Sequence, residues 1–345
     1  MAKKGGRNVK IKVLSRTDLV EILELTKVID GVEAVYKAKA EGNVAAWPLV
    51  EHHFGNGAVA DIRSGGAFGD ISIHGAKLLN NFPENAKNNL PVFTGVLMAF
   101  DSNTGLPMGI MDASYITSLR TGAAAAIGTA ALARPDSKTL LLVGAGRQSI
   151  YLLGATLLQM PQIEEVLVVD TFDPNNARQY VQTIKERLKN ELSVDCLSTK
   201  FEFVEDLRSA VSRSDIILTI TRSTEPLIMK EWLKPGTHLS CIGADMVGKE
   251  EIDPEIFSIA RSFADDAVQC CNVGEMEIPA KKGIISADTI CGEIGEVLVG
   301  TKEGRIEDSD ITVFDATGHA ALDLVTAKIA LQMSETKKIG PVVEI

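Results

Sequence analysis

At 345 residues the chain is long enough for about two domains, since one domain commonly spans about 150 residues. Apolar residues make up 45% of it and charged residues 23%, which is ordinary for a globular protein with a buried core. The formal net charge of −11 argues against a nucleic-acid surface, which needs a basic patch, and against attachment to an anionic membrane.

Cysteine and histidine usage points to a cytoplasmic protein without a metal. The five cysteines are odd in number and form no C-x-x-C pair, which favours reduced thiols. The five histidines are scattered, so we expect no metal site. Residues 1–7 are basic but lead into no apolar signal-peptide core, and no apolar stretch is long enough to span a membrane.

The first part of the chain predicts an α+β region made largely of antiparallel sheet. Val9–Leu14 alternates as a strand does, and Ser15 then begins a stretch with apolar residues at helical spacing as far as Tyr36. Strand-like runs follow at 71–79, 92–100 and 106–111. The last two are joined by the turn-rich sequence D-S-N-T-G, which is typical of a hairpin.

From Lys138 onward strands and helices alternate. Strands are predicted at 139–143, 165–170, 200–204, 215–221, 238–243, 262–265 and 311–315, and helices at 148–159 and 174–190. This order predicts a parallel sheet with right-handed crossovers. An Ala-rich helix at 121–133 is expected to link the two regions, and a helical run at 322–333 to fold back onto the first.

A glycine turn after the first of these strands has the pattern of a dinucleotide site. Gly144 permits a tight turn, and Gly146 lets the backbone approach a pyrophosphate that sits on the following helix N-terminus. The residues expected to contact the dinucleotide here are Gly144, Ala145, Gly146, Arg147, Gln148 and Ser149. The alternative is a nucleotide-free α/β domain with a tight glycine turn, and the strand–turn–helix context argues against it.

Asp170 ends the next predicted strand, 26 residues after Gly144. An acid at that place accepts hydrogen bonds from the adenosine ribose and repels a 2′-phosphate, which favours NAD over NADP. Arg147 leaves NADP open as the alternative, because a cation beside the turn could serve a phosphate.

Motifs spread along the chain carry a family resemblance. They are His74-Gly-Ala-Lys77, Phe82-Pro-Glu-Asn85, Thr104-Gly-Leu-Pro107, Ser118-Leu-Arg120-Thr121, Gly144-Ala-Gly-Arg-Gln148, Ile242-Gly-Ala-Asp245, Gly248-Lys249 and Phe314-Asp-Ala-Thr-Gly318. In this order and spacing, the chain resembles the ornithine cyclodeaminase / mu-crystallin family over nearly its whole length. The resemblance implies an α/β fold, with a Rossmann-type dinucleotide-binding domain at 121–319. It also implies an α+β substrate-binding and dimerisation domain at 1–120 plus 320–345, and hence a homodimer.

The resemblance also assigns roles to single residues. Lys77 is expected near the substrate carboxylate and the developing imine, and Arg120, in a polar break before the Ala-rich helix, is expected to bind the carboxylate. Asp245 is expected to orient the amino group and to take or relay protons. Thr121 is expected to contact the cofactor. Without the motifs, these side chains would be read as a surface lysine, a helix-end arginine and a capping aspartate.

Two segments depart from the family pattern. Val247 stands where proline is common, and Leu49 and Val50 follow Pro48 where some members carry an arginine. Arg63, fourteen residues before Lys77, is a candidate second carboxylate-binding cation. Glu51, or His52 beside it, could instead contact a substrate side chain. The substrate is therefore the least defined part of the interpretation.

The function expected from the resemblance is NAD-dependent hydride transfer at the α-carbon of a small amino or imino acid. The product imine could be hydrolysed by an amino-acid dehydrogenase such as alanine dehydrogenase, attacked by a side-chain amine in a cyclodeaminase, or formed in reverse by a ketimine or imino-acid reductase. The segments around Asp170 and Phe314 favour the cyclodeaminase branch. The alternative from another class is a non-catalytic NAD(P)-binding protein that stores a ligand, which the presence of the expected site residues argues against.

Overall fold

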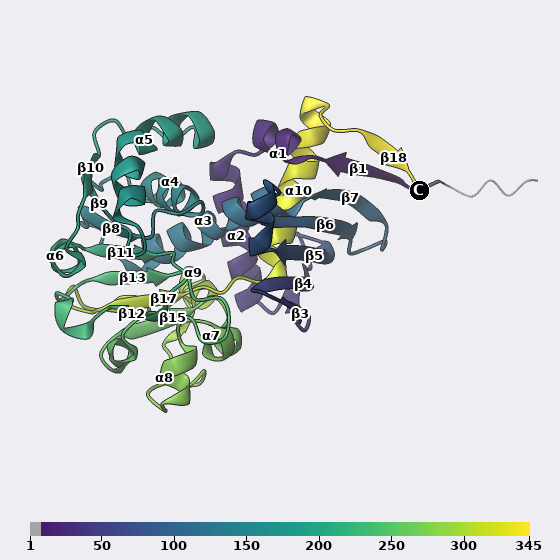
Figure 1. Ribbon diagram of the computed structural model, residues 1–345. Helices are drawn as coiled ribbons and strands as arrows, with labels where there is room; N and C mark the ends of the chain where they lie inside the picture. The colour runs from purple at the N-terminus through teal and green to yellow at the C-terminus, as the bar shows by residue number, and fades with distance from the viewer. Residues whose placement is uncertain (1–7) are drawn as a thin grey trace, which may run out of the picture. The chain divides into compact units, whose positions relative to one another are not determined.

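The computed structural model describes residues 8–345, which form two units with one large sheet each (Figure 1). The basic residues 1–7 lie outside the described residues. Unit 1 combines Met1–Arg120 with His319–Ile345, and unit 2 is the intervening stretch Thr121–Gly318. Unit 1 is therefore completed only by the last residues of the chain.

Unit 1 is built on a mainly antiparallel sheet. Its strands lie in the order β18-β1-β7-β6-β5-β4-β2, with β3 also paired to β4. Strands β1 and β7 run parallel, and the other neighbours run antiparallel. The elements are β1 (Lys10–Leu14), α1 (Arg16–Ile22), α2 (Leu25–Ala40), β2 (Val44–Ala46), β3 (Val50–Gly55), β4 (Ala58–Ala67), β5 (Ile73–Asn81), the 3-10 helix Pro83–Asn88, β6 (Phe93–Asp101), β7 (Pro107–Asp112), the first part of α3 (Ala113–Leu132), α10 (Ala320–Lys337) and β18 (Val342–Glu344).

One face of this sheet is covered by the last helix of the chain. Helix α10 packs on β4 and β5 and lies beside α2 (Figure 1). Side chains alternate between the two faces of each strand, so the residues of β5 that face α10 are buried while their neighbours point the other way. The covered face holds the charged residues considered below.

Unit 2 is built on a wholly parallel sheet of eight strands in the order β10-β9-β8-β11-β13-β17-β15-β16. This confirms the α/β fold class expected from the alternating pattern. The elements are β8 (Thr139–Val143), α4 (Ser149–Gln159), β9 (Glu165–Val169), α5 (Pro174–Leu192), β10 (Lys200–Phe203), α6 (Leu207–Arg213), β11 (Ile216–Thr219), β12 (Thr224–Ile228), the 3-10 helix Lys230–Trp232, β13 (His238–Cys241), β14 (Glu250–Ile252), the 3-10 helix Pro254–Ser258, β15 (Arg261–Ala264), α7 (Ala267–Val273), α8 (Glu277–Lys281), β16 (Gly292–Glu293), α9 (Ile294–Leu298) and β17 (Thr312–Asp315). Strands β12 and β14 form a separate parallel pair.

The helix that links the two units starts earlier than expected. The prediction began it at residue 121, after a polar break, whereas α3 begins at Ala113 and contains Arg120. Asp112 provides the start, because its Oδ1 accepts hydrogen bonds from Tyr115 N–H and from the Ser114 hydroxyl. Within the supposed break, hydroxyl groups donate to backbone carbonyls four residues earlier, which makes the polar residues compatible with a helix.

The segment from Ser15 to Tyr36 forms two helices where its apolar spacing predicts one. The apolar spacing from Ser15 to Tyr36 suggested one helix, but the structure has α1 and α2 separated at Leu23, where the backbone is extended. No Gly or Pro marks this break, and the apolar residues on both sides of it are buried, so their spacing continues across it. The start of α1 has the expected capping box between Ser15 and Asp18.

The described part of the chain has neither a membrane-spanning helix nor a cluster of metal ligands. Between residues 8 and 345, no helix has both the length and the apolar character needed to cross a membrane. In the same range, no three or more His, Cys, Asp or Glu side chains are grouped as metal ligands. All five cysteines are free thiols.

Candidate functional site

The covered face of the unit 1 sheet gathers charged residues from three strands. Arg63 on β4 lies directly opposite Lys77 on β5, in a register in which directly paired residues point to the same face. Asp61 stands two residues before Arg63 on that face, and Glu51 on β3 is paired with Asp61. Three residues singled out from sequence, Lys77, Arg63 and Glu51, therefore lie on one face of one sheet.

Asp323 of α10 joins Lys77 to Arg120. Lys77 Nζ donates to Asp323 Oδ2 at 2.7 Å and to Thr117 Oγ1 at 3.2 Å. Arg120 Nε donates to Asp323 Oδ1 at 3.2 Å. Lys77 is 1% exposed, Asp323 0% and Arg120 7%. A buried ion network thus connects β5, α3 and α10.

The charges in this network depend on one another. Burial disfavours the Lys77 ammonium, Asp323 favours it and Arg120 disfavours it, so that the pKa of Lys77 is lowered to about 8. Burial alone would raise the pKa of Asp323, but the Lys77 and Arg120 charges outweigh burial and lower it. At neutral pH the pair is therefore an ion pair and not two neutral groups.

The cluster holds more positive than negative charge. Its cations are Arg63, Lys77 and Arg120, and its carboxylates are Asp323 and Asp61. Arg63 Nε lies 3.6 Å from Asp61 Oδ2. Apart from the exposed Glu51, the cluster has one cation in excess. Arginine offers planar donors and lysine a point charge, and both bind a carboxylate. The arrangement is suited to a small molecule with one carboxylate group.

Two acids on the same face provide acceptors beside these cations. The Oδ1 atom of Asp61 is buried and, within residues 8–345, has no hydrogen-bond partner. Burial raises the pKa of Asp61, although Arg63 and Lys77 counteract this. Glu51 is exposed, and its Oε1 lies 2.7 Å from His53 Nε2. A buried acceptor without a donor is a place where a ligand donor would be stabilised.

Unit 2 presents the glycine turn at the carboxyl end of β8. Gly144 has φ of +101°, which favours glycine, and a Cβ there would lie 2.6 Å from the Ile220 carbonyl oxygen. Gly146 faces open space where a Cβ would stand, so a ligand can approach its backbone closely. Helix α4 begins at Ser149, directly after the turn.

Asp170 follows the end of β9 and is bonded to this turn. Its Oδ2 accepts from Ala145 N–H at 3.1 Å, and its Oδ1 accepts from Phe172 N–H at 3.0 Å and Asp173 N–H at 3.1 Å. A carboxylate has about four acceptor positions, so these three bonds leave capacity for a ligand hydroxyl. The acid therefore both holds the turn and can recognise a group placed against it.

The turn fits a dinucleotide by its geometry. The N-terminus of α4 receives no side-chain cap, and although Ser149 N–H and Tyr151 N–H donate to the Gly146 and Gln148 carbonyls, the positive end of the helix faces the turn. The Oε1 atom of Gln148 is buried and has no hydrogen-bond partner in the described part of the chain. Arg147 is exposed beside the turn, and Thr121 directly follows Arg120 in α3.

Asp245 lies in a loop of unit 2 and not at the end of a strand as expected. The sequence predicts a strand that runs to residue 243, but β13 ends at Cys241. Ile242 N–H makes the last bond to β11, at the Thr219 carbonyl, and Gly243 N–H donates to the Glu251 side chain instead. The Asp245 side chain is 45% exposed, and its Oδ1 lies 2.6 Å from Lys249 Nζ. The loop leads to β14 (Glu250–Ile252).

Sequence reasoning missed Asp323, which binds both predicted cations. The available signal was a single acid inside the apolar run Ala320-Ala-Leu-Asp-Leu-Val, where its neighbours in the sequence on both sides are apolar. A charged residue in such a position is buried, and a buried charge requires a partner. Lys77, the other charge in an apolar segment, is that partner.

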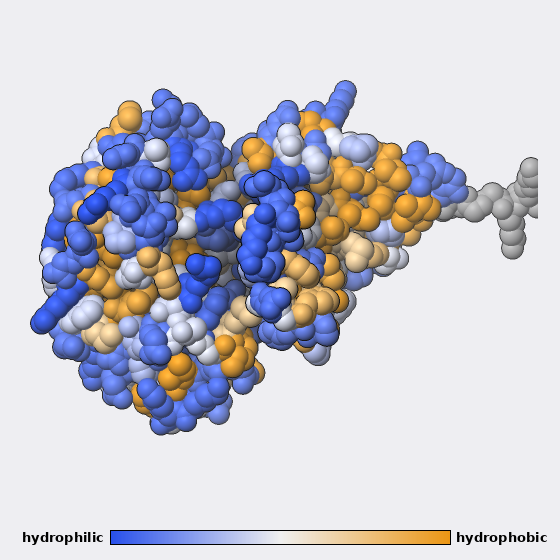
Figure 2. All heavy atoms as spheres, in the orientation of Figure 1, coloured by the Kyte–Doolittle hydropathy of each residue, from blue (hydrophilic) through white to orange (hydrophobic). Residues whose placement is uncertain are grey.

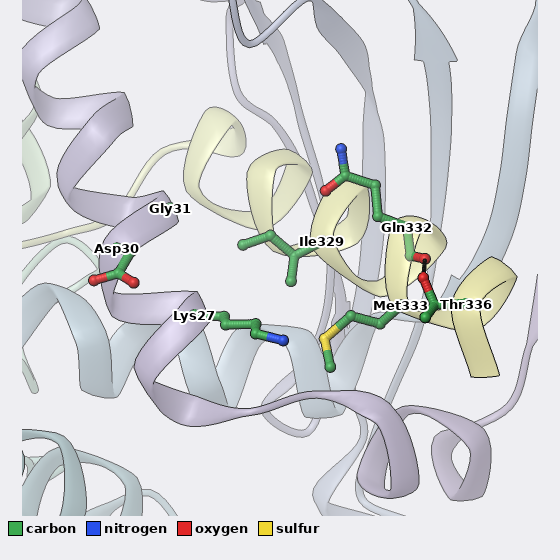
Figure 3. Close-up of a pocket in the computed structure, with 7 residues that line it drawn as sticks. All are labelled: Lys27, Asp30, Gly31, Ile329, Gln332, Met333 and Thr336. Atoms are coloured by element: carbon green, nitrogen blue, oxygen red, sulfur yellow. Dashed lines mark hydrogen bonds between the residues drawn. The ribbon is translucent and has the colours of Figure 1, made fainter.

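A groove between α2 and α10 lies elsewhere on unit 1 (Figure 3). It encloses about 550 Å³ and is lined by Lys27, Asp30, Gly31, Ile329, Gln332, Met333 and Thr336. Ile329 follows Asp323 by six residues and so lies on a different side of α10 from the ion network. The groove is not part of the charged site.

Comparison with known proteins identifies relatives along nearly the whole chain. The profile of the ornithine cyclodeaminase/mu-crystallin family matches residues 9–338. An alanine dehydrogenase of Archaeoglobus fulgidus is 32% identical over 328 residues, covering 95% of this chain and 96% of that protein. The chain therefore belongs to the ornithine cyclodeaminase/mu-crystallin family, as the motifs suggested.

Solved structures show the same fold. An archaeal alanine dehydrogenase dimer with bound NAD superposes with a TM-score of 0.88 at 30% identity, covering 97% of this chain and 99% of that one. The Δ1-pyrroline-2-carboxylate reductase of Thermococcus litoralis, in complex with NADH and L-proline, gives 0.87 at 28% identity, covering 96% and 99%.

The ion network predicts a large loss of stability when one partner is removed. Lys77→Met should lower the free energy of unfolding by about 3–5 kcal/mol, because Asp323 is left as a buried charge with a single cation. The double variant Lys77→Met/Asp323→Asn should recover part of this loss. Urea unfolding measures both.

The matched control is Lys37→Met, which removes an exposed pair with Glu33 at 2.6 Å. It should cost less than about 1 kcal/mol, since exposed ion pairs contribute little. Equal costs for the variants at positions 77 and 37 would show that the buried network does not support the fold.

Proposed function

We propose that this member of the ornithine cyclodeaminase/mu-crystallin family is an NAD-dependent enzyme that transfers a hydride at the α-carbon of a small amino or imino acid. The observation that carries the proposal is the buried cluster of Lys77, Arg120 and Arg63, whose excess positive charge matches one substrate carboxylate. The named activities of the similar proteins, an alanine dehydrogenase and an imino-acid reductase, support the same chemistry.

The two units have different tasks in this proposal. Unit 1 binds the substrate, with Arg120 and Arg63 as planar donors to the carboxylate and Lys77 as a point charge. Unit 2 holds the cofactor at Gly144 and Gly146, with Thr121 as a further contact, and Asp170 accepts the ribose hydroxyls. When bound, NAD would supply the hydride acceptor, and NADH the hydride donor.

Asp245 serves the amino group of the substrate. During oxidation the α-carbon–hydrogen bond breaks and its electron pair leaves as hydride, while the carbon–nitrogen double bond forms and the nitrogen loses a proton. A carboxylate that accepts a hydrogen bond from that nitrogen can take the proton. Asp245 is a half-exposed acid whose Oδ1 is engaged by Lys249, and the proton is proposed to go to its other oxygen. In the reducing direction the same proton returns to nitrogen.

Two branches of this chemistry have separate support. The named relatives favour simple oxidation or reduction, as in an amino-acid dehydrogenase or an imino-acid reductase. Asp61 favours the cyclodeaminase branch expected from sequence, because its buried Oδ1 could accept from an amine on the substrate side chain. A cyclodeaminase needs that second amine to attack the imine and displace ammonia.

A panel of amino acids and cyclic imines, assayed with NAD and NADH, tests the function and separates the branches. An oxidoreductase accumulates NADH in step with product, whereas a cyclodeaminase releases ammonia without net NADH. Asp245→Asn should lower kcat by about 100-fold or more while NADH binding is retained. Wild-type turnover by this variant would contradict the role of Asp245, and NADH binding without turnover of any panel member would support ligand storage instead.

The cofactor assignment predicts a change of preference at Asp170. Asp170→Asn keeps one acceptor oxygen but loses the charge, so it should bind NADH about 10-fold more weakly and discriminate less against NADPH. Cofactor fluorescence titration measures both affinities. The control is Asp206→Asn, which changes an acid of unit 2 that accepts from a backbone N–H, that of Arg208, at the start of α6. An unchanged ratio of NADH to NADPH affinity in the Asp170 variant would remove the ribose assignment.

We further propose that the chain forms a homodimer through the uncovered face of the unit 1 sheet. A row of paired residues crosses the four strands β3 to β6 and consists of Val50, Ile62, Leu78 and Val96. Met98 follows two residues after Val96 on β6 and so points to the same face. Val50, Leu78, Val96 and Met98 are exposed apolar residues, and Figure 2 shows apolar surface gathered over the strands of unit 1. Contiguous apolar surface of this kind is typical of an interface. Light scattering should give twice the 37.0 kDa chain mass, and a monomer at micromolar concentration would contradict the proposal.

A further inference from the structure

The loop that carries Asp245 is held at Gly243 by two side chains, those of Glu251 and Lys249. The Gly243 N–H donates to Glu251 Oε2 at 2.8 Å, and the Gly243 carbonyl accepts from Lys249 Nζ at 3.1 Å. A Cβ at residue 243 would lie 2.4 Å from Glu251 Oε1, so the contact requires glycine. Both polar groups of one peptide residue are thus held by side chains from the far end of the same loop.

Glu251 is itself fixed in the interior of unit 2. It is fully buried, and its Oε2 also accepts from Thr219 Oγ1 at 2.6 Å, while its Oε1 accepts from Thr221 N–H at 2.6 Å. Its own N–H donates to Glu275 Oε1 at 2.8 Å. The Glu251 carboxylate therefore ties the end of β11 to the start of the Asp245 loop, and it provides a rigid base for the contacts at Gly243.

Lys249 extends from this base to Asp245. The N–H of the preceding Gly248, which has φ of +81°, donates to Glu277 Oε2 at 2.7 Å and anchors the second end of the loop. Lys249 Nζ then lies 2.6 Å from Asp245 Oδ1. Within residues 8–345, Asp245 Oδ2 makes no hydrogen bond, and the side chain is half exposed. Lys249 therefore holds Oδ1 of Asp245, and Oδ2 is available to accept a hydrogen bond from a ligand.

An isolated ion pair between an exposed lysine and an exposed aspartate contributes little to stability and holds neither side chain firmly. Lys249 differs because its ammonium is shared between the carboxylate and a backbone carbonyl that a buried acid already fixes. Two anchored ends and a shared donor reduce the number of orientations open to the Asp245 side chain. Catalytic geometry is sensitive to such restriction, since a misplacement of about 1 Å can cost about 100-fold in rate.

We propose that Lys249 is the positioning residue of Asp245: it holds Oδ1 and so presents Oδ2 to the amino group of the substrate. This inference rests on the proposed function, in which Asp245 receives that amino group. Glu251 contributes by fixing Gly243, to which Lys249 is also bound.

The test compares ligands with and without an amino group. The protein loaded with NADH is titrated with an amino acid and with the carboxylic acid that lacks only its amino group. Wild type should bind the amino acid more tightly. Lys249→Ala should lose about 10-fold in affinity for the amino acid and little for the carboxylic acid, and its kcat should fall by about 10- to 100-fold. Lys249→Arg keeps a hydrogen-bond donor, so it should restore part of the affinity for the amino acid and part of kcat.

The control is Lys37→Ala, which removes an exposed lysine of similar ion-pair length in α2 and should change none of these values. Equal losses for the two ligands in Lys249→Ala, or retained kcat, would overturn the positioning role. A loss of NADH affinity that Lys249→Arg does not repair would also overturn it, because Lys249 would then serve the cofactor. Equal binding of both ligands by wild type would instead remove the proposed role of Asp245 itself.

Discussion

The carboxylate of Asp323 is the interaction on which the candidate site depends. A buried charge is stable only when it is paired, and Asp323 is paired with Lys77 at 2.7 Å and with Arg120 at 3.2 Å. The three residues belong to α10, β5 and α3, so one carboxylate sets the relative positions of three elements of unit 1. Arg120 is also the last residue of the first segment of unit 1, and α3 continues from there into unit 2.

In unit 2, two buried acids of the candidate site are stabilised by hydrogen bonds and, within the described residues, not by ion pairs. These acids, Asp170 and Glu251, accept hydrogen bonds mainly from backbone N–H groups. Asp170 receives three such bonds, and Glu251 receives two together with a threonine hydroxyl. Hydrogen bonds from backbone N–H groups to a buried carboxylate fix the backbone conformation of the loops that donate them. Both acids hold segments at the carboxyl ends of parallel strands, where α/β sheets bind ligands.

The parts of the molecule that could be predicted from the sequence are those whose signal is local. The turn at Gly144 is recognisable because a buried strand, two glycines and a helix follow one another within a few residues. The start of α3 was misplaced because its cap, Asp112, lies outside the Ala-rich stretch that suggested the helix. The positions of Lys77 and Arg120 in the sequence pointed to function, but only through their family motifs.

What the sequence could not reveal is pairing between distant residues. Asp323 lies 246 positions from Lys77, and nothing in the local pattern of either residue names the other. The same is true of Arg63 and Lys77, whose proximity follows from the register between β4 and β5. Asp61 likewise becomes a candidate only because, within residues 8–345, its buried Oδ1 has no hydrogen-bond donor. In the proposed function the substrate meets these contacts, and none of them can be recognised from a local sequence pattern.

The most direct measurement of the central claim follows the fate of an α-hydrogen. An amino-acid substrate identified in the panel is labelled with deuterium at the α-carbon and incubated with the protein and NAD. Hydride transfer predicts that deuterium is found in the reduced nicotinamide of a dehydrogenase, or returned to the product of a cyclodeaminase. Loss of the label to water would show that the α-carbon is deprotonated instead, and it would contradict the account.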